Sequence, residues 1–217
     1  MTDKPRSRGR PRNKERAGSD PRHDLIRSGL ELLTQNGFLS TGIDAIVRNA
    51  NVPKGSFYYY FPSKEEYVSA VLSSYDSFFE YKLKKHLCDG NYTPVERMDN
   101  FITDACSGME KYSFTRGCLV GNMMQESAGL PVFFIGKLRE ILKNWQTIVS
   151  LCLGEALQSG EIISEFDSIK LAEIFWSGWE GAVMQAKVYR SAQPVTDFWD
   201  YFKASVRYPR RPDDGGV

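Results

Sequence analysis

Histidine is scarce in this sequence, and its cysteines are far apart. The 217 residues include only two histidines, His23 and His86. The cysteines, none of which belongs to a Cys-x-x-Cys pair, are Cys88, Cys106, Cys118 and Cys152. Metal sites and redox motifs need closely spaced ligands or thiols, and the sequence has neither a phosphate-binding glycine loop nor a nucleophile elbow. We therefore expect reduced thiols, no metal, no cofactor and no catalytic residue.

Long apolar runs are also missing. The first apolar stretch begins near Leu25 and is interrupted by charged residues. A membrane helix needs about 18 consecutive apolar residues, and an exported protein needs an apolar leader. These absences predict a cytoplasmic protein with no membrane partner.

Neither sign of charge dominates the whole chain, which has 28 Lys/Arg, 27 Asp/Glu and a formal net charge of +1. The distribution is uneven, because residues 1–66 contain 12 Lys/Arg and 8 Asp/Glu, whereas residues 67–217 contain 16 and 19. A basic N-terminal segment before a neutral or acidic body is typical of a nucleic-acid-binding protein. Since 41% of the residues are hydrophobic, the chain can bury a core and form one or two domains.

Apolar residues recur with helical spacing, and no segment shows sustained two-residue alternation, so we predict an all-α fold. Caps and breaks set the boundaries, such as Asp20-Pro21 before the first helix and Asn36-Gly37 after it. Thr41 is the expected cap of the second helix. The predicted helices span residues 21–36, 43–50, 54–61, 64–86, 93–113, 118–128, 131–159, 167–190 and 195–206.

These helices group into two domains between two irregular ends. Residues 1–20 are rich in Arg, Lys, Pro, Gly and Ser, and we expect them to form a disordered basic arm. The predicted parts after the arm are a three-helix helix-turn-helix DNA-binding domain (21–66), a C-terminal helical effector-binding and dimerisation domain (67–207) and a flexible tail (208–217).

The arm contains a possible second DNA-reading element, Arg8-Gly9-Arg10-Pro11-Arg12, which is like the core of an AT-hook. A flat Arg-Gly-Arg segment fits a narrow A·T minor groove, so Arg8 and Arg10 are candidate DNA contacts. The alternative is a basic tail that only attracts phosphates. Both interpretations predict binding that weakens steeply with salt.

Two short helices joined by a tight break suggest a helix-turn-helix, whose second helix enters the major groove of DNA. Here the second helix begins with Lys54, which can reach a base or phosphate, and with Gly55, which allows close approach of the backbone. Ser56 adds a hydroxyl. The three tyrosines at positions 58–60 spread around more than half a turn and cannot all be core. We expect them to contact DNA, and the alternative is an aromatic wedge against the following helix.

The motif Gly37-Phe38 … Thr41-Gly42-Ile43 … Val52-Pro53-Lys54-Gly55-Ser56-Phe57-Tyr58-Tyr59-Tyr60-Phe61 … Ser63-Lys64-Glu65 resembles the signature of TetR-family transcriptional regulators. The resemblance implies phosphate contacts by Thr41, Tyr58, Tyr60 and Lys64. It also implies that the residues nearest the base edges are Lys54, Gly55, Ser56 and Tyr59. Gly42 belongs to the same DNA-binding set. Many members have His at the position of Tyr60, but tyrosine can also donate to a phosphate.

One helix-turn-helix makes too few contacts for selective binding, and a dimer places two recognition helices about 34–36 Å apart on a pseudo-palindromic operator. The resemblance implies a homodimer in which the last two helices form a four-helix bundle. Gly178, Ala182 and Ala186 form a small-residue stripe that allows close helix approach, and the last helix has an apolar face. The candidate interface residues on that face are Phe198 and Phe202. Packing within one chain is the alternative, since it needs the same small residues.

A bulky aromatic wall follows the neighbouring face of the 167–190 helix, and such walls with a few polar groups line small-molecule pockets. The alternative is simply a large core. The candidate effector-binding residues are Gln125, Trp145, Trp176, Trp179, Glu180 and Lys187.

The segment from Arg116 to Glu126, with the 175–187 segment, resembles a subgroup of the family that includes an acrylate-responsive regulator and the repressor of N-ethylmaleimide reductase. For the latter, the resemblance implies that Cys118 and Lys187 form a sensing pair for electrophiles and oxidants. A helix N-terminus, Arg116 and Lys187 are expected to stabilise the Cys118 thiolate. The alternative is a buried, inert cysteine, and we expect the other three cysteines to be structural.

These features together predict a bacterial repressor that a small electrophile or unsaturated acid releases from DNA. A reversible hydrophobic effector and an effector-independent DNA-binding protein are the alternatives. An enzyme using Cys118 and Lys187 would require catalytic turnover of an electrophile rather than one-to-one labelling.

Overall fold

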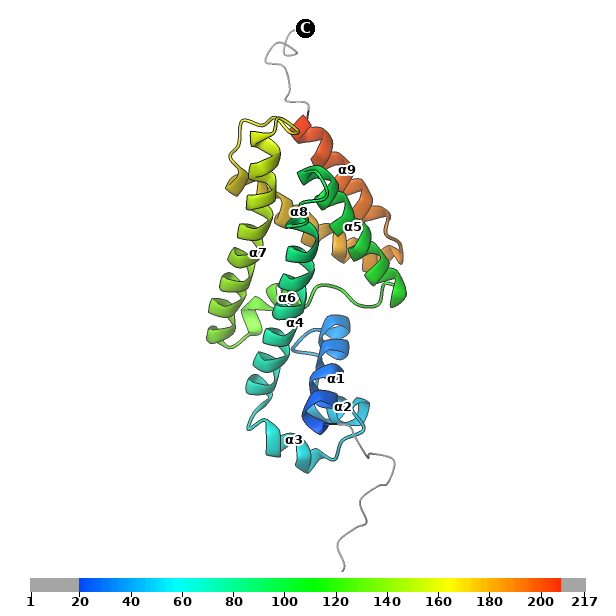
Figure 1. Cartoon of the computed structure of the whole chain (residues 1–217). Helices are drawn as coiled ribbons and strands as arrows, with labels where there is room; N and C mark the ends of the chain where they lie inside the picture. Colours follow the sequence, from blue (N-terminus) through cyan, green and yellow to red (C-terminus); the bar gives the residue numbers. More distant parts are fainter. Residues whose placement is uncertain (1–19, 208–217) are drawn as a thin grey trace, which may run out of the picture.

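The computed structural model describes residues 20–207, and within them every regular element is helical (Figure 1). The predictions for the arm, including Arg8 and Arg10, and for the tail 208–217 lie outside these residues. The elements are α1 (Pro21–Asn36), α2 (Ile43–Asn49), α3 (Lys54–Tyr60), α4 (Lys64–Leu87), α5 (Pro94–Lys111), α6 (Leu119–Gln125), the short 3₁₀ helix η2 (Ser127–Gly129), α7 (Val132–Gln158), α8 (Ser168–Tyr189) and α9 (Gln193–Arg207). The all-α prediction is confirmed.

Local capping explains where most of these helices begin. Asp20 accepts a hydrogen bond from the Arg22 amide at 3.0 Å at the start of α1, and Asp167 accepts one from the Lys170 amide at 2.8 Å at the start of α8. The expected cap at Thr41 is wrong. Gly42 is the N-cap of α2, because the Thr41 hydroxyl donates instead to the Gly37 carbonyl at 2.6 Å.

The first three helices form one end of the molecule and pack on the beginning of α4 (Figure 1). Gly29 allows α1 to pack closely against α4, since a Cβ at this position would overlap the Tyr67 hydroxyl and the Val71 side chain. The Tyr67 hydroxyl also donates to the Leu25 carbonyl of α1 at 2.7 Å. Phe57 of α3 is fully buried, with its ring centroid 5.1 Å from that of Tyr67. These contacts fix the orientation of α3.

The other end of the molecule is a bundle in which α8 packs between α7 and α9 (Figure 1). Its core is aromatic, with the Trp145 and Trp176 centroids 5.3 Å apart. Asp99 of α5 holds α9 by accepting hydrogen bonds from Trp199 Nε1 at 2.6 Å and Lys203 Nζ at 2.8 Å. None of the helices in the described part of the chain is long and apolar enough to cross a membrane.

Candidate functional site

The outer face of α3 exposes aromatic and polar groups at the end of the molecule that α1, α2 and α3 form. Tyr59 is 82% exposed and Tyr58 is 50% exposed, while Lys54 and Gly55 are also exposed. No described atom lies within 4 Å of the place where a Cβ of Gly55 would stand, so a large ligand can approach this backbone closely. Ser56, on the same first turn, is half-buried. The residues that sequence analysis placed nearest DNA bases therefore lie together on one accessible helix.

Two of the expected phosphate contacts have structural partners within the chain. Thr41 is buried with its hydroxyl bonded to Gly37. Lys64 Nζ donates to the Phe38 carbonyl at 2.6 Å and lies over the Phe38 ring, and burial lowers the pKa of this amine. Both side chains thus hold the loop after α1. Tyr58 remains displayed, and the half-buried Tyr60 packs edge-on against its neighbour Tyr59.

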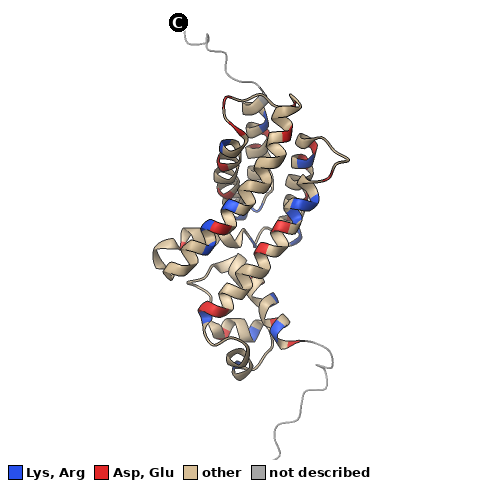
Figure 2. Ribbon diagram, turned by 60° about the vertical axis from the view of Figure 1, so that its left-hand side comes forward, with Lys and Arg blue, Asp and Glu red and all other residues tan. Residues whose placement is uncertain are grey.

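The described helix-turn-helix is not itself basic. Residues 20–66 contain five Lys/Arg and six Asp/Glu, and Figure 2 shows both signs interspersed along the helices. Lys54 forms an ion pair with Asp44 of α2 at 2.8 Å, with both side chains largely exposed. The basic excess of the N-terminal third of the chain therefore lies within residues 1–19.

The C-terminal end of α1 is held by donors from α6, α8 and the segment before α6. The last carbonyls of a helix have no partner within it and must bond elsewhere. Asn122 Nδ2 and the Gly117 amide donate to the Thr34 carbonyl at 2.8 and 3.0 Å. Lys187 Nζ donates to the Gln35 carbonyl at 3.3 Å, and a cation there also opposes the negative end of the helix dipole.

Glu126, directly after α6, holds the loop that follows α1. Its carboxylate accepts hydrogen bonds from the Phe38 amide at 2.7 Å and the Leu39 amide at 3.1 Å. The carboxylate fits there because Gly37 has no Cβ and adopts a positive φ of 82°. Helix α6 thus contacts α1 through Asn122 within the helix, and the loop after α1 is held by Glu126, which follows the helix.

Cys118 is the N-cap of α6, as the sequence predicted for a residue at or near a helix start. Its sulfur accepts a hydrogen bond from the Gly121 amide at 3.4 Å. The prediction of a stabilised thiolate is wrong in this conformation. The side chain is only 6% exposed, and burial together with the nearby Glu180 carboxyl raises the pKa of the thiol well above its usual value. Arg116 is paired instead with Glu31 at 3.1 Å, and the Lys187 amine is bonded to α1.

Two buried polar groups on α8 lack hydrogen-bond partners. Neither carboxyl oxygen of Glu180 has a hydrogen-bond partner of normal geometry. Burial raises the pKa of this group to about 7, and the adjacent Cys118 thiol partly opposes that shift. Trp176 Nε1, one turn earlier, is also unpartnered, whereas Trp145 Nε1 donates to Asp76 at 2.8 Å. Glu180 lies against Gly121, since a Cβ there would overlap its carboxyl. Cys118 and Glu180 therefore lie together at the start of α6, and Trp176 lies one turn away from Glu180 on α8.

The other candidate effector residues are placed differently. Trp179 belongs to the aromatic core and lies 5.3 Å from Phe101 between ring centroids. Gln125 is exposed, with its amide 2.7 Å from the Met184 sulfur, and Lys187 belongs to the α1 junction. Neither Gln125 nor the Lys187 amine lines the buried cluster around Cys118 and Glu180.

Comparison with known proteins identifies this arrangement. Residues 25–71 match the model of bacterial regulatory proteins of the tetR family, and residues 94–202 match the tetracycline repressor-like C-terminal domain. The chain belongs to the TetR family of transcriptional regulators. It is a DNA-binding regulator and not an enzyme.

Three TetR-family relatives illustrate the similarity. The chain is 43% identical over 195 residues to the transcriptional regulator AcuR of Cereibacter sphaeroides, covering 90% of this chain and 88% of AcuR. It is 26% identical over 194 residues to the transcriptional repressor NemR of Escherichia coli, covering 88% and 96%. A crystal structure of the regulatory protein TetR from Rhodobacter sphaeroides matches with a TM-score of 0.82 and 40% identity, covering 85% and 97%. The resemblance to this subgroup is confirmed.

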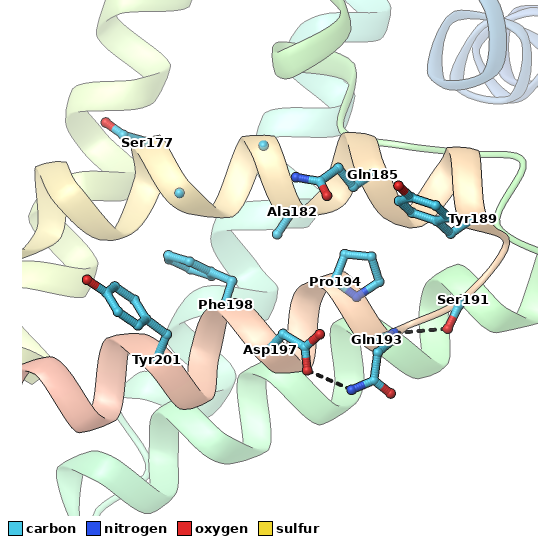
Figure 3. A pocket seen from close by; sticks show the side chains of 12 residues that line it. Ser177, Ala182, Gln185, Tyr189, Ser191, Gln193, Pro194, Asp197, Phe198 and Tyr201 are labelled. Carbon is cyan, nitrogen blue, oxygen red and sulfur yellow. Dashed lines mark hydrogen bonds between the residues drawn. The ribbon is translucent and has the colours of Figure 1, made fainter.

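TetR-family regulators act as dimers, and a groove of about 790 Å³ between α8 and α9 lies on the surface expected for the partner (Figure 3). Gly178, Ala182 and Phe198 line it. Gly178 also serves packing within the chain, because a Cβ there would overlap the Phe198 ring. The two remaining candidates, Ala186 and Phe202, are buried within the single chain.

Asn122 and Glu126 have no role predicted from the sequence, although both lie in the segment that carries the subgroup resemblance. Their signal is weak, namely a polar side chain within a short apolar helix and another directly after it. Only the folded chain shows that both reach α1, since Glu126 and Phe38 are 88 residues apart in sequence. This junction connects the two domains of the TetR-family chain.

Proposed function

We propose that this protein is a homodimeric repressor, acting in the bacterial cytoplasm, that binds a pseudo-palindromic operator and is released when a small electrophile reacts with Cys118. The effector class is an unsaturated carbonyl or carboxylate compound, or a quinone. The observation that carries this proposal is the position of Cys118. It begins the seven-residue helix whose Asn122, together with Glu126 directly after it, bonds to α1 and the loop after it.

A group added to the Cys118 sulfur requires α6 to shift. The sulfur is buried, it accepts the Gly121 amide, and the Glu180 carboxyl already lies against Gly121. Because interiors are close-packed, a new substituent displaces its neighbours rather than filling empty space. Movement of α6 pulls on α1 and alters the separation of the two recognition helices in a dimer. A shift from mostly bound to mostly released needs about 5.5 kcal/mol of preference for the DNA-incompetent form.

The DNA-release experiment tests this directly. A fluorescent fragment from upstream of the protein's own gene is bound, and the anisotropy is followed during titration with N-ethylmaleimide, a quinone or acrylate. We expect wild type and Cys106→Ser to release the fragment, and Cys118→Ser to retain it. Retention by all three proteins in every titration would contradict the proposed effector class.

A second candidate function is a reversible, non-covalent effector. The unpartnered Trp176 Nε1 and Glu180 carboxyl favour it, because a bound polar molecule could supply the missing partners. Release of both wild type and Cys118→Ser by acrylate alone would favour this function. A protein that binds DNA equally well under all conditions would instead be effector-independent.

The DNA-contacting face of α3 gives a separate prediction. Tyr58→Phe removes one exposed hydroxyl and should weaken operator binding about fivefold, the value of one hydrogen bond, without lowering the melting temperature. Tyr81→Phe, which alters an exposed tyrosine on α4, is the matched control and should bind normally. Fluorescence anisotropy measures both, and equal affinity of the two variants would refute the phosphate contact.

A further inference from the structure

The buried neighbourhood of Cys118 contains its own acid–base group. The thiol is 6% exposed and the Glu180 side chain is 7% exposed. Both groups meet at Gly121, whose amide donates to the Cys118 sulfur, and a Cβ on Gly121 would overlap the Glu180 carboxyl and lie 3.5 Å from the Cys118 Cβ. The nearby carboxyl also raises the pKa of the thiol, yet neither carboxyl oxygen has a hydrogen-bond partner of normal geometry. Leaving a buried carboxyl unpaired is costly, so this arrangement calls for a functional explanation.

The groups that face Glu180 come from three helices. The titratable ones are Cys118 at the start of α6 and Tyr75 of α4, whose phenol has a raised pKa because of burial and of the nearby thiol. Helix α7 contributes the uncharged Trp145 to the same cluster. Within residues 20–207, no Lys, Arg or His forms an ion pair with Glu180, and Lys187 of the same helix bonds to α1.

A buried thiol that reacts as a nucleophile must lose its proton to a group inside the protein, because bulk hydroxide and buffer bases have little access to it. A general base must lie within reach of the proton that it removes. The carboxyl that faces Cys118 meets this requirement, and with a pKa of about 7 it is available as carboxylate in neutral solution. Tyr75 does not, since its own pKa is raised far above neutrality.

We propose that Glu180 is the proton acceptor for Cys118 when this thiol adds to an α,β-unsaturated carbonyl compound. This inference rests on the covalent mechanism proposed above and adds the residue that makes the buried thiol reactive. It also gives a reason for the unpaired carboxyl, because a carboxylate held by strong donors would be a weaker base.

The addition balances without any further reactant. Glu180 takes the thiol proton as the sulfur forms a bond to the β-carbon of the electrophile, and the C=C electron pair moves to give an enolate. The carboxylic acid of Glu180 then returns its proton to the α-carbon. The product is a thioether, no group leaves, and Glu180 ends as the carboxylate. Trp176 Nε1, the unpartnered donor one turn earlier on α8, is available to the carbonyl oxygen on which the enolate charge develops.

A purely electrostatic role for Glu180 predicts the opposite result. A nearby negative charge disfavours the thiolate, so its removal would lower the thiol pKa and speed the reaction. Proton transfer to Glu180 instead predicts that removal of the carboxylate slows the reaction. The sign of the change therefore separates the two roles.

The test measures the rate of N-ethylmaleimide labelling at Cys118 by peptide mass spectrometry between pH 5.5 and 9. In wild type we expect the rate to rise between pH 6 and 8 and then level off. Glu180→Gln should be about 100-fold slower at pH 8, near the lower end of general-base effects, and should rise tenfold per pH unit without levelling. Glu180→Asp should keep the levelling with an intermediate rate. Exposed Cys88, read from the same digests, should label equally in all three proteins.

Labelling of Glu180→Gln as fast as wild type, or faster, would overturn the proton-acceptor role. The DNA-release assay, run on the same samples, separates this failure from that of the proposed function. Rapid labelling of wild-type Cys118 without DNA release would refute the regulatory role and leave Glu180 as the acceptor. No labelling of wild-type Cys118 at any pH would overturn both.

Discussion

The pKa of the buried Cys118 thiol is set by its surroundings rather than by its position at a helix start. Cys118 was expected to be a stabilised thiolate because it begins a helix near two cations. The position was predicted correctly, but the pKa was not, because burial and the Glu180 carboxyl outweigh one backbone hydrogen bond. Such an outcome depends on which side chains are excluded from water, and a linear sequence does not contain that information.

Glu180 makes the stability of the protein depend on pH. Its pKa is about 7 in the folded chain and about 4.5 when unfolded, so the folded state holds the proton more tightly. Ionisation of the buried carboxyl therefore lowers the free energy of unfolding as the pH rises. This loss is absent below about pH 4.5 and complete above about pH 7, and it reaches at most about 3 kcal/mol.

Glu180→Gln removes this loss. The unfolding free energy of Glu180→Gln minus that of wild type should therefore be larger at pH 8 than at pH 5, by up to about 3 kcal/mol. Urea denaturation at the two pH values measures the difference. Glu110→Gln, which changes an exposed glutamate, is the matched control. An equal effect of Glu180→Gln at pH 5 and pH 8 would contradict the raised pKa.

Helix boundaries were largely predictable because their signals are local. Asp20 and Asp167 cap as expected, and the observed ends of the helices differ from the predicted ones by a few residues. The main difference is the predicted helix 118–128, which is α6 followed by the separate 3₁₀ helix η2. Contacts between elements were less predictable, and the junction of α6 with α1 could not be read from caps or periodicity.

Glu126→Ala should loosen that junction. The substitution removes a carboxylate that accepts two backbone amides, and hydrogen bonds to charged groups contribute about 1.5–3 kcal/mol each. We expect a loss of roughly 3 kcal/mol of unfolding free energy, the lower end of the range for two such bonds, and faster hydrogen exchange at the Phe38 and Leu39 amides.

Glu110→Ala, an exposed control at the end of α5, should stay within about 0.5 kcal/mol of wild type. Unfolding curves and hydrogen-exchange mass spectrometry give the two readouts. Unchanged exchange in the loop after α1 would show that Glu126 does not hold it.

The complete molecule is larger than one chain. The small-residue stripe of α8 predicts a helix pair, α8 and α9, at the dimer interface, and this stays a prediction. Some residues of the stripe also pack within the chain, a role that helical periodicity cannot separate from dimerisation. Gly178 lets α9 approach α8 within the chain, and Ala186 is buried there. Gly181 differs, since it lines the surface groove and no described atom lies within 4 Å of where its Cβ would stand.

Gly181→Glu should therefore leave the chain folded and block dimerisation. In a two-fold dimer built on this groove, the new carboxylate would lie in the interface, where an unpaired charge is costly. The matched control is Gly136→Glu, which changes an exposed glycine within α7 that also has open space around its Cβ position. Analytical ultracentrifugation should find Gly181→Glu as a 24.7 kDa monomer and Gly136→Glu as a dimer.

The same pair of variants connects assembly to DNA binding. Two recognition helices held in one dimer bind a two-part operator about 10²–10⁴ times more tightly than one helix alone. Gly181→Glu should therefore lose at least about 100-fold in operator affinity, while Gly136→Glu retains it. A Gly181→Glu protein that remains dimeric and binds normally would place the interface away from the α8–α9 groove.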